Sequence, residues 1–347
     1  MNENNNHPID FVITWVDGND PVWRAEKAKY QNKSIGDMRD NRYRDWDTLR
    51  YWFRGVERYA PWVNHVFFVT YGHFPKWLNV DNPKLTIVNH RDYIPVEYLP
   101  TFSNRPIELN FHRIHGLSEH FVYFNDDMFL LKPVQKTDFF IKGLPCDSAV
   151  QDVISARGVD DSGNKLMGEA IYSVVLYNTA VINRNFNKKD VIRKNRSKWY
   201  SLKYGRNMIK NLILSYWNNF TGFKMVHYPY SYLKSTYEEV WRIEPEVLSL
   251  ACSHKFRTAT DVSQYVFSNW QMAKGQFMPR DLSIGKLMSI SNNPDKNEEI
   301  YQVIKKQKVK LLCVNDQFSG DNFEVVKKQW QEAFEVILPE KSGFEKY

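Results

Sequence analysis

Short apolar runs recur through the first 130 residues and alternate with amphipathic stretches. Each run ends on a polar residue or is directly followed by one. The runs are Ile9–Val16, Val66–Thr70, Leu85–Val88 and Phe121–Asn125. Apolar residues at helical spacing separate the first two runs, at residues 45–59, and recur at residues 105–117 before the last run. Strands that alternate with helices form mainly parallel sheets. We therefore expect an α/β fold with a mainly parallel central sheet and additional helical elements.

The pattern beyond residue 145 is less regular. We predict strands at Val174–Ile182 and Leu311–Val314, a basic helical stretch at Asp190–Leu214 and an amphipathic helix at Asn322–Ile337. The sequence contains no internal repeat and no long linker. We expect an α/β region over residues 1–145 and a second region over 146–347 that packs on it, so that the two form one compact unit.

Composition narrows the class of protein. The 347 residues carry a formal net charge of +7, which suits an anionic partner, and no arginine-rich tail or RNA-binding motif favours nucleic acid. The cysteines, Cys146, Cys252 and Cys313, are scattered and indicate a reducing compartment. The first residues lack a signal pattern, and no run reaches the roughly 18 apolar residues of a membrane span. We expect a cytoplasmic protein whose membrane contact, if any, is peripheral, on the inner face of the cell membrane.

The run FVYFNDDMFL at residues 121–130 places Asn125, Asp126 and Asp127 inside an otherwise apolar segment. Mg²⁺ is usually bound by one or two carboxylates together with phosphate oxygens of a substrate. Ligands of parallel α/β sheets bind beyond the carboxyl ends of the strands. The alternative is a turn whose aspartates cap the next segment. Two carboxylates between apolar runs carry a desolvation cost unless a cation or hydrogen-bond donors compensate, which favours a cation site.

Four other places have side chains that could take part in chemistry. They are Asp17 with Gly18 after the first strand, His112 with Arg113 in IELNFHRIHG, His227 in HYPY, and Asp316 after LLCVN. Ordinary turn or structural roles remain open for each of them. The sequence has no Walker loop, GxSxG elbow, HExxH helix or GxGxxG fingerprint, which disfavours P-loop kinases and NAD enzymes.

Three long segments together resemble one known family. IDFVITWVDGNDP (9–21), RYRDWDTLRYWFRGVERYAPWVNHVFFVTYG (42–72) and IELNFHRIHGLSEHFVYFNDDMFLLKPV (107–134) are similar to the first two regions of the Stealth family. Residues 227–254 and 310–318 resemble its later regions less sharply. The resemblance implies a GT-A-like nucleotide-sugar-binding fold. It also implies transfer of sugar-1-phosphate from a UDP-sugar to a hydroxyl of a glycan acceptor, with release of UMP, in cell-surface polysaccharide synthesis.

The resemblance also implies roles for individual residues and regions. Residues 1–145 are expected to bind the nucleotide-sugar and the metal, and residues 146–347 to complete the site on the acceptor side. The expected ligands of a divalent metal, Mg²⁺ or Mn²⁺, are Asp126, Asp127 and Asp316. The expected catalytic group is His112 as the base, Arg113 as a phosphate clamp, and Asp17. The expected substrate and nucleotide contacts are Asp17, Gly18, Asn125, Arg42, Arg44, Arg50 and His227.

Two other functions fit the same residues. A metal-dependent GT-A glycosyltransferase would use the same donor but release UDP, because attack would fall on the anomeric carbon. A non-catalytic glycan-binding protein would use the basic surface and the aromatic side chains. In the favoured case the partners are a UDP-sugar and an oligosaccharide or polysaccharide acceptor, including a lipid-linked one, and no nucleic acid.

Overall fold

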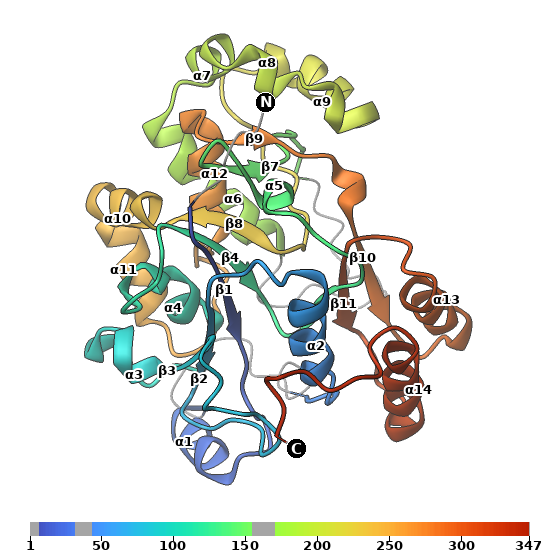
Figure 1. The fold of residues 1–347 in the computed structure, drawn as a ribbon. Coiled ribbons are helices and arrows are strands. Elements are labelled where there is room, and N and C mark those ends of the chain that lie inside the picture. The colour runs from blue at the N-terminus through green and yellow to red at the C-terminus, as the bar shows by residue number, and fades with distance from the viewer. Residues whose placement is uncertain (1–6, 32–43, 155–170, 347) are drawn as a thin grey trace.

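The structure is a computed structural model that describes residues 7–31, 44–154 and 171–346 (Figure 1). Its central sheet has the strand order β3-β2-β1-β4-β8. The strands are β1 (Ile9–Thr14), β2 (Val66–Thr70), β3 (Leu85–Asn89), β4 (His120–Phe124) and β8 (Tyr230–Leu233). The first four are parallel, and only β8 runs antiparallel to its neighbour β4. The predicted α/β class with a mainly parallel central sheet is confirmed.

Two smaller sheets flank the central one. The second sheet has the order β10-β11-β5, built from β10 (Gly285–Ile290), β11 (Leu311–Asp316) and β5 (Met128–Leu130). Within it β10 and β11 are parallel, and β5 is antiparallel to β11. The third sheet combines β6 (Phe140–Ile141), β7 (Leu144–Asp147) and β9 (Met278–Pro279). Strands from both halves of the chain therefore share each of the three sheets.

Helices surround the sheets. The α-helices of the first half are α1 (Pro21–Gln31), α2 (Leu49–Tyr59), α3 (His90–Tyr93), α4 (Asn104–Leu109) and α5 (Lys136–Phe139). Those of the second half are α6 (Ile171–Asn185), α7 (Lys188–Lys194), α8 (Arg196–Trp199), α9 (Met208–Ile213), α10 (Lys234–Ile243), α11 (Pro245–Ser253), α12 (Tyr265–Lys274), α13 (Pro294–Lys305) and α14 (Phe323–Glu335). Short 3₁₀ helices are η2 (Val96–Tyr98), η3 (Phe111–Arg113), η4 (Leu202–Asn207), η5 (Leu214–Tyr216) and η6 (Leu282–Ile284). No helix in the described ranges has the length and apolar character needed to cross a bilayer.

Helix α2 packs between the central and second sheets. Its Trp52 ring contacts Phe124 of β4 with centroids 5.4 Å apart, and its Phe53 ring contacts Phe68 of β2 at 5.9 Å. On the other side, a Cβ at Gly55 would lie 3.2 Å from the Leu130 carbonyl oxygen of β5, tighter than ordinary contact. The glycine therefore permits the close approach of helix to strand that the amphipathic pattern of residues 45–59 alone does not reveal.

Three predicted elements differ from the structure. Val174–Ile182 is part of helix α6, not a strand. Its buried residues are Val174, Asn178, Thr179, Val181 and Ile182. The steps of four from Val174 to Asn178 and from Asn178 to Ile182 place these on one helical face, which the β-branched composition concealed. The helical stretch Asp190–Leu214 is broken into α7, α8, η4, α9 and η5, with Gly205 at a positive φ of 53°. The helical segment at 105–117 ends early, as α4 and η3.

A buried ion pair joins α2 to the C-terminal segment. Nε and Nη2 of Arg54 donate to the two carboxylate oxygens of Glu345 at 2.8 and 3.0 Å, and Nη1 donates to the Leu338 carbonyl at 2.8 Å. The two side chains are only 6% and 4% exposed. Burial alone would raise the pKa of Glu345, but the hydrogen bonds and charge of Arg54 outweigh it and hold that pKa below its usual value.

We predict that Glu345→Gln lowers the free energy of unfolding at pH 7 by about 3 kcal/mol, because Arg54 then stays buried with only the exposed Glu335 as a carboxylate partner. A carboxyl with a lowered pKa stabilises the folded state above its unfolded pKa, and the contribution disappears as pH falls through the folded value. Urea unfolding should therefore show a smaller difference below about pH 4 than at pH 7.

The matched control is Glu332→Gln, since Glu332 lies 3.9 Å from Lys328 in an exposed pair. Its effect should stay below about 0.5 kcal/mol. The role of the buried pair would be contradicted if both variants lost the same free energy of unfolding. It would also be contradicted if the loss in Glu345→Gln did not change with pH.

Candidate active site

The turn Asn125–Asp127 leads the chain from the central sheet into the second sheet, since it follows β4 and precedes β5. The Asn125 carbonyl accepts from the Met128 N–H at 3.2 Å, and the Asp127 carbonyl accepts from the Val314 N–H of β11 at 2.9 Å. Backbone hydrogen bonds thus fix the turn on both sides. The side chains of the turn are presented where the two sheets meet.

A hydrogen-bond network surrounds this turn. The Tyr123 hydroxyl lies 3.1 Å from Thr14 Oγ1 and also contacts Oδ1 of Asn125. Nδ2 of Asn125 lies 3.3 Å from Nε2 of His227, and Nδ1 of His227 lies 2.7 Å from the hydroxyl of Tyr265. Both ring nitrogens of His227 are engaged, so the orientation of the imidazole is fixed.

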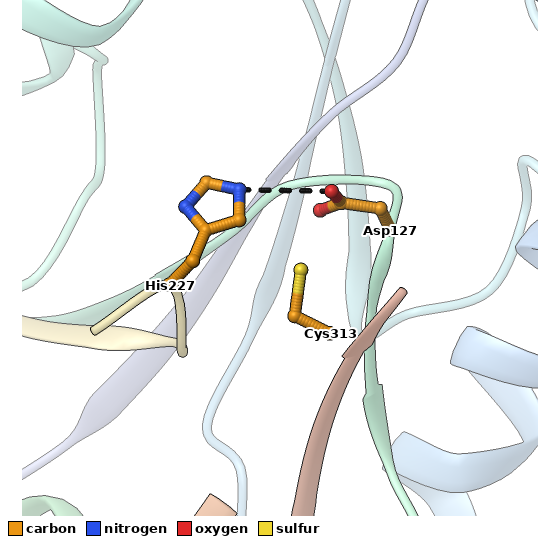
Figure 2. Close-up of side chains that lie close together, drawn as sticks. All are labelled: Asp127, His227 and Cys313. Carbon is orange, nitrogen blue, oxygen red and sulfur yellow. Dashed lines mark ion pairs between the residues drawn. The ribbon is translucent and has the colours of Figure 1, made fainter. Parts of the chain in front are cut away.

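Three side chains from distant segments meet beside the turn, as Figure 2 shows: Asp127, His227 and Cys313. One ligand atom of each lies within 4.8 Å of the others, and His227 Nε2 is 3.6 Å from Asp127 Oδ2. The second oxygen, Oδ1 of Asp127, is buried and has no hydrogen-bond partner among the described residues. A buried carboxylate oxygen without a partner is costly, so this atom fits a cation-binding role.

The protonation of these groups follows from their surroundings. Burial alone would lower the pKa of His227, but the charge of Asp127 and a hydrogen bond to it more than compensate, and the pKa is raised. Burial raises the pKa of the Cys313 thiol well above its usual value, and Asp127 adds to the rise. Because a protonated thiol is a poor metal ligand, carboxylate oxygens are the stronger donors at this site.

A second carboxyl group crowds the same place. Asp126 is exposed, yet desolvation by the surrounding protein, and then the charges of Asp127 and Asp45, raise its pKa to about 7. Burial also raises the pKa of Asp45, and the charge of Asp17 adds to that rise. The charges of Asp127 and Asp45 thus act against ionisation of Asp126, and the charge of Asp17 acts against that of Asp45. We call these four residues the carboxyl cluster. A divalent cation would relieve that repulsion.

A positive charge faces these carboxyl groups. Burial raises the pKa of the fully buried Glu108, and the charge of Arg257 opposes that rise. Arg257 likewise opposes the increase in the pKa of Asp126 and lowers the pKa of His227. The guanidinium therefore lies within electrostatic reach of all three groups, which suits the binding of an anion beside the carboxylates.

A cavity of about 750 Å³ opens next to the loop that follows β1. The basic residues in its wall are Arg24, Lys27, Arg44 and Lys327. Gly18 and Asn19 of the β1 loop also line it, as does Asp45, the member of the carboxyl cluster whose charge acts on Asp126. The nearby Asp17 backbone N–H donates to Nε2 of His73 at 2.8 Å, which holds the β1 loop against the segment after β2.

Asp316 lies apart from the group around Asp127. Its Oδ2 accepts from Nε1 of Trp46 at 3.1 Å and lies 3.6 Å from Nε of Arg44. Side chains alternate between the two faces of a strand, and Asp316 is an odd number of residues from Cys313. It therefore points to the opposite face of β11, toward the wall of the cavity that Arg44 lines. Among the described residues Asp316 does not join the group of possible ligands around Asp127, and a metal ion held by both stays a prediction.

His112 and Arg113 also lie away from the turn. The ring of His112 packs 6.0 Å from the rings of Tyr237 and Trp241 in α10, and Arg113 lies 5.4 Å over the Trp241 ring. Helix α10 starts directly after Leu233, which pairs with His120 at the beginning of β4. Burial, then Arg113 and nearby Lys234, lowers the pKa of His112 to about 3. The structure therefore does not bring this weak base to the turn that closes β4.

The remaining predicted contacts have separate locations. Arg50 lies in the first turn of α2. Its Nη2 lies 3.4 Å from Oδ1 of Asp47, and its guanidinium lies over the ring of Trp77, so its contacts are with these residues and not with the carboxyl cluster. Arg42 lies outside the described residues. Asn125 and His227 are brought together, as the network above shows.

Several residues of the site were not predicted from the sequence: Asp45, Glu108, Cys313, His73 and Arg257. His73 follows β2 at the same edge as Asp17, so the rule that ligands bind beyond strand ends could have found it. Arg257 precedes α12 in an irregular segment and carries no local signal. Cys313 sits inside an apolar strand, where a thiol usually belongs to the core.

Comparison with known proteins identifies similar chains. The chain matches Stealth protein conserved region 1 at residues 7–35 and conserved region 2 at residues 42–146. It is 39% identical over 345 residues to the capsular polysaccharide phosphotransferase WcwK of Streptococcus pneumoniae, covering 99% of both chains. It is 38% identical to the exopolysaccharide phosphotransferase cps2G of Lactiplantibacillus plantarum, covering 97% of this chain and 96% of that protein.

Among solved structures, the apo form of the glycosyltransferase GlyE of Streptococcus pneumoniae overlaps 96% of this chain and 62% of its own, with a TM-score of 0.38 and 10% identity. That likeness is too low to place individual residues. The end-to-end similarity to the two phosphotransferases, together with the matched regions, shows that the chain belongs to the Stealth family.

Proposed function

We propose that this enzyme transfers sugar-1-phosphate from a UDP-sugar to a hydroxyl of a glycan acceptor, forming a phosphodiester and releasing UMP. Its full-length relatives are named capsular and exopolysaccharide phosphotransferases, which supports phosphotransfer in polysaccharide synthesis. The observation that carries the proposal is the carboxyl cluster around Asp126 and Asp127, with Arg257 and a basic cavity beside it. These are the groups that a diphosphate donor and a divalent ion require.

Asp126 and Asp127 would hold a divalent ion, Mg²⁺ or Mn²⁺. The fit rests on the unpartnered Oδ1 of Asp127 and on Asp126, whose pKa is raised by burial and then by the charges of Asp127 and Asp45. Asp45 is near enough to take part through water. When bound, such an ion would offset the negative charge of the phosphate oxygens and of the departing UMP. Asp316, bound to Arg44 and Trp46, would instead orient the wall of the donor cavity.

Cationic side chains would bind the donor. The charge of Arg257 acts on Asp126 of the carboxyl cluster, and Arg44 with the other basic residues lines the nearby cavity. Guanidinium groups bind phosphate oxygens through two parallel hydrogen bonds. Gly18 allows the β1 loop to approach the donor closely.

His227 would accept the proton of the acceptor hydroxyl. Tyr265 orients the ring through Nδ1, as in a general base, and Nε2, which lies beside Asp127 and Asn125, would take the proton. We therefore move the proposed base from His112 to His227. The acceptor oxygen would attack the β-phosphorus, the bond from that phosphorus to the oxygen bridging it to the α-phosphate would break, and UMP would leave with that oxygen.

We predict that incubation with UDP-sugars, Mg²⁺ or Mn²⁺ and a glycan acceptor releases UMP in step with a sugar-phosphate diester. Chromatography of the nucleotide product with phosphorus NMR of the glycan measures both. Release of UDP with a glycosidic product would instead identify attack on the anomeric carbon, which is the rival glycosyltransferase reaction. The Asp127→Asn protein serves as the blank for metal-driven hydrolysis of the donor.

We predict that Asp127→Asn lowers turnover by at least about a hundredfold while the thermal midpoint stays within a few degrees, since the change removes charge and keeps shape. The matched control is Asp81→Asn, an exposed aspartate in a surface turn. A non-catalytic glycan-binding protein would show no turnover to lose and unchanged glycan affinity. That outcome would refute an enzymatic role for the cluster.

We predict that Arg257→Gln raises the KM for the UDP-sugar by about tenfold or more, the range for loss of a hydrogen bond to a charged group. Arg257→Lys should recover part of the loss, because it keeps the charge without the paired hydrogen bonds. Arg242→Gln is the control, since Arg242 is exposed on α10. An unchanged KM in Arg257→Gln would remove this residue from the donor site.

A further inference from the structure

A layer of short helices forms one end of the molecule. It consists of residues 188–217, which we call the end layer, and contains α7, α8, η4, α9 and η5. Figure 1 shows α7, α8 and α9 side by side at the end of the molecule farthest from the C-terminus. The end layer contributes no residue to the carboxyl cluster or to the cavity that adjoins it.

The inner side of the end layer is firmly attached. Trp199 is fully buried, and its ring stacks 5.3 Å from that of Phe220. The buried Asn211 donates to the carbonyls of Ala149 at 2.7 Å and Trp199 at 2.6 Å. Nζ of the buried Lys188 donates to the Leu214 carbonyl. The backbone conformation of the layer is therefore set by these contacts, and its outward side chains are not needed to hold it.

Those outward side chains are unusually apolar. Leu202 and Tyr216 are 84% and 87% exposed, and Ile209, Leu212, Ile213 and Trp217 are about half exposed. Six of the 17 large hydrophobic residues that are exposed in the described structure fall within these 16 consecutive positions. Isolated exposed apolar residues are ordinary, but a concentration of this kind marks a binding surface.

The same layer carries the positive charge of the chain. Residues 188–217 contain nine lysines and arginines and a single acidic residue, Asp190, a net charge of +8. Because the whole chain has a net charge of +7, all the other residues together carry −1. Five basic side chains of the layer are exposed and make no ion pair within the described ranges: Lys189, Lys194, Arg196, Lys203 and Arg206.

We propose that the end layer docks on an anionic lipid bilayer, with its exposed apolar residues in the headgroup region and its basic residues on the lipid phosphates. Tyrosine and tryptophan favour this boundary because one part of each ring is apolar and another is polar. Basic side chains at a membrane surface are attracted by anionic lipids. Docking would hold the enzyme beside a lipid-linked acceptor, a consequence that rests on the proposed function, whereas the docking itself does not.

Other occupants fit the surface less well. A second copy of the chain would bring two surfaces of the same positive charge together. An anionic glycan would satisfy the basic residues but leave Leu202, Ile213 and Tyr216 in water. A bilayer with anionic lipids satisfies both kinds of side chain.

The test is flotation of the full chain with vesicles of equimolar phosphatidylglycerol and phosphatidylcholine, compared with vesicles of phosphatidylcholine alone. We expect binding to the mixed vesicles and at least tenfold weaker binding to the neutral ones. Tyr216→Ser with Trp217→Ser, and separately Lys203→Gln with Arg206→Gln, should each weaken binding to the mixed vesicles about tenfold or more. Light scattering and the thermal midpoint of each variant show whether it is folded and monodisperse.

Two control pairs match these changes elsewhere on the surface. Val325→Ser with Val336→Ser removes exposed apolar residues in and just after α14, and Lys305→Gln with Lys306→Gln removes exposed charge at the end of α13. Both should bind vesicles as the unaltered chain does. The proposal would be overturned if the chain did not float with the mixed vesicles, or if control and end-layer variants lost vesicle binding equally. Self-association of the chain that Tyr216→Ser with Trp217→Ser abolishes would also overturn it. Flotation needs no turnover, so failure of the proposed reaction leaves this test intact.

Discussion

The backbone hydrogen bonds of the turn Asn125–Asp127 are the constraint on which the site depends. The turn closes β4 of the central sheet and opens β5 of the second sheet, and the Asp127 carbonyl is bonded to Val314 of β11. Because neither sheet can shift without breaking this connection, the carboxyl groups of the turn have fixed positions. His227, which precedes β8 on the edge of the central sheet, and Cys313 of β11 are brought to the turn by the same two sheets.

That rigidity has an electrostatic cost. Two unit charges 4 Å apart interact by about 4 kcal/mol at an effective dielectric of 20, so neighbouring carboxylates at the turn disfavour folding while they are ionised. The fold offsets part of the cost with Arg257 and with a His227 of raised pKa. The charges of Asp127 and Asp45 still add to the rise that burial gives to the pKa of Asp126. A cluster that remains uncompensated in the protein alone is suited to a cationic ligand, since binding then removes repulsion as well as forming contacts.

The sequence was informative where a signal is local. Alternating apolar runs predicted the four parallel strands and located the turn at their edge. Prediction failed where geometry depends on distant segments: Cys313 reaches the turn through the pairing of β11 with β5, and Arg257, in the segment before α12, acts on Asp126 and His227 by its charge. His112 illustrates another limit. Its neighbour Phe111 packs 4.8 Å from Tyr123, close to the network, yet His112 itself turns toward α10. Proximity in a motif does not determine the direction of a side chain.

The division of the chain at residue 145 therefore describes sequence pattern better than structural independence. Without the second half, β4 would lose its partner β8, and β5 would lose β11. Two strand edges with apolar faces would then be open to solvent, a condition that favours aggregation. Because the turn lies between those two strands, its geometry would be lost with them. We infer that the two regions form one catalytic unit, in which the second half shapes the site as much as the first half supplies its carboxylates.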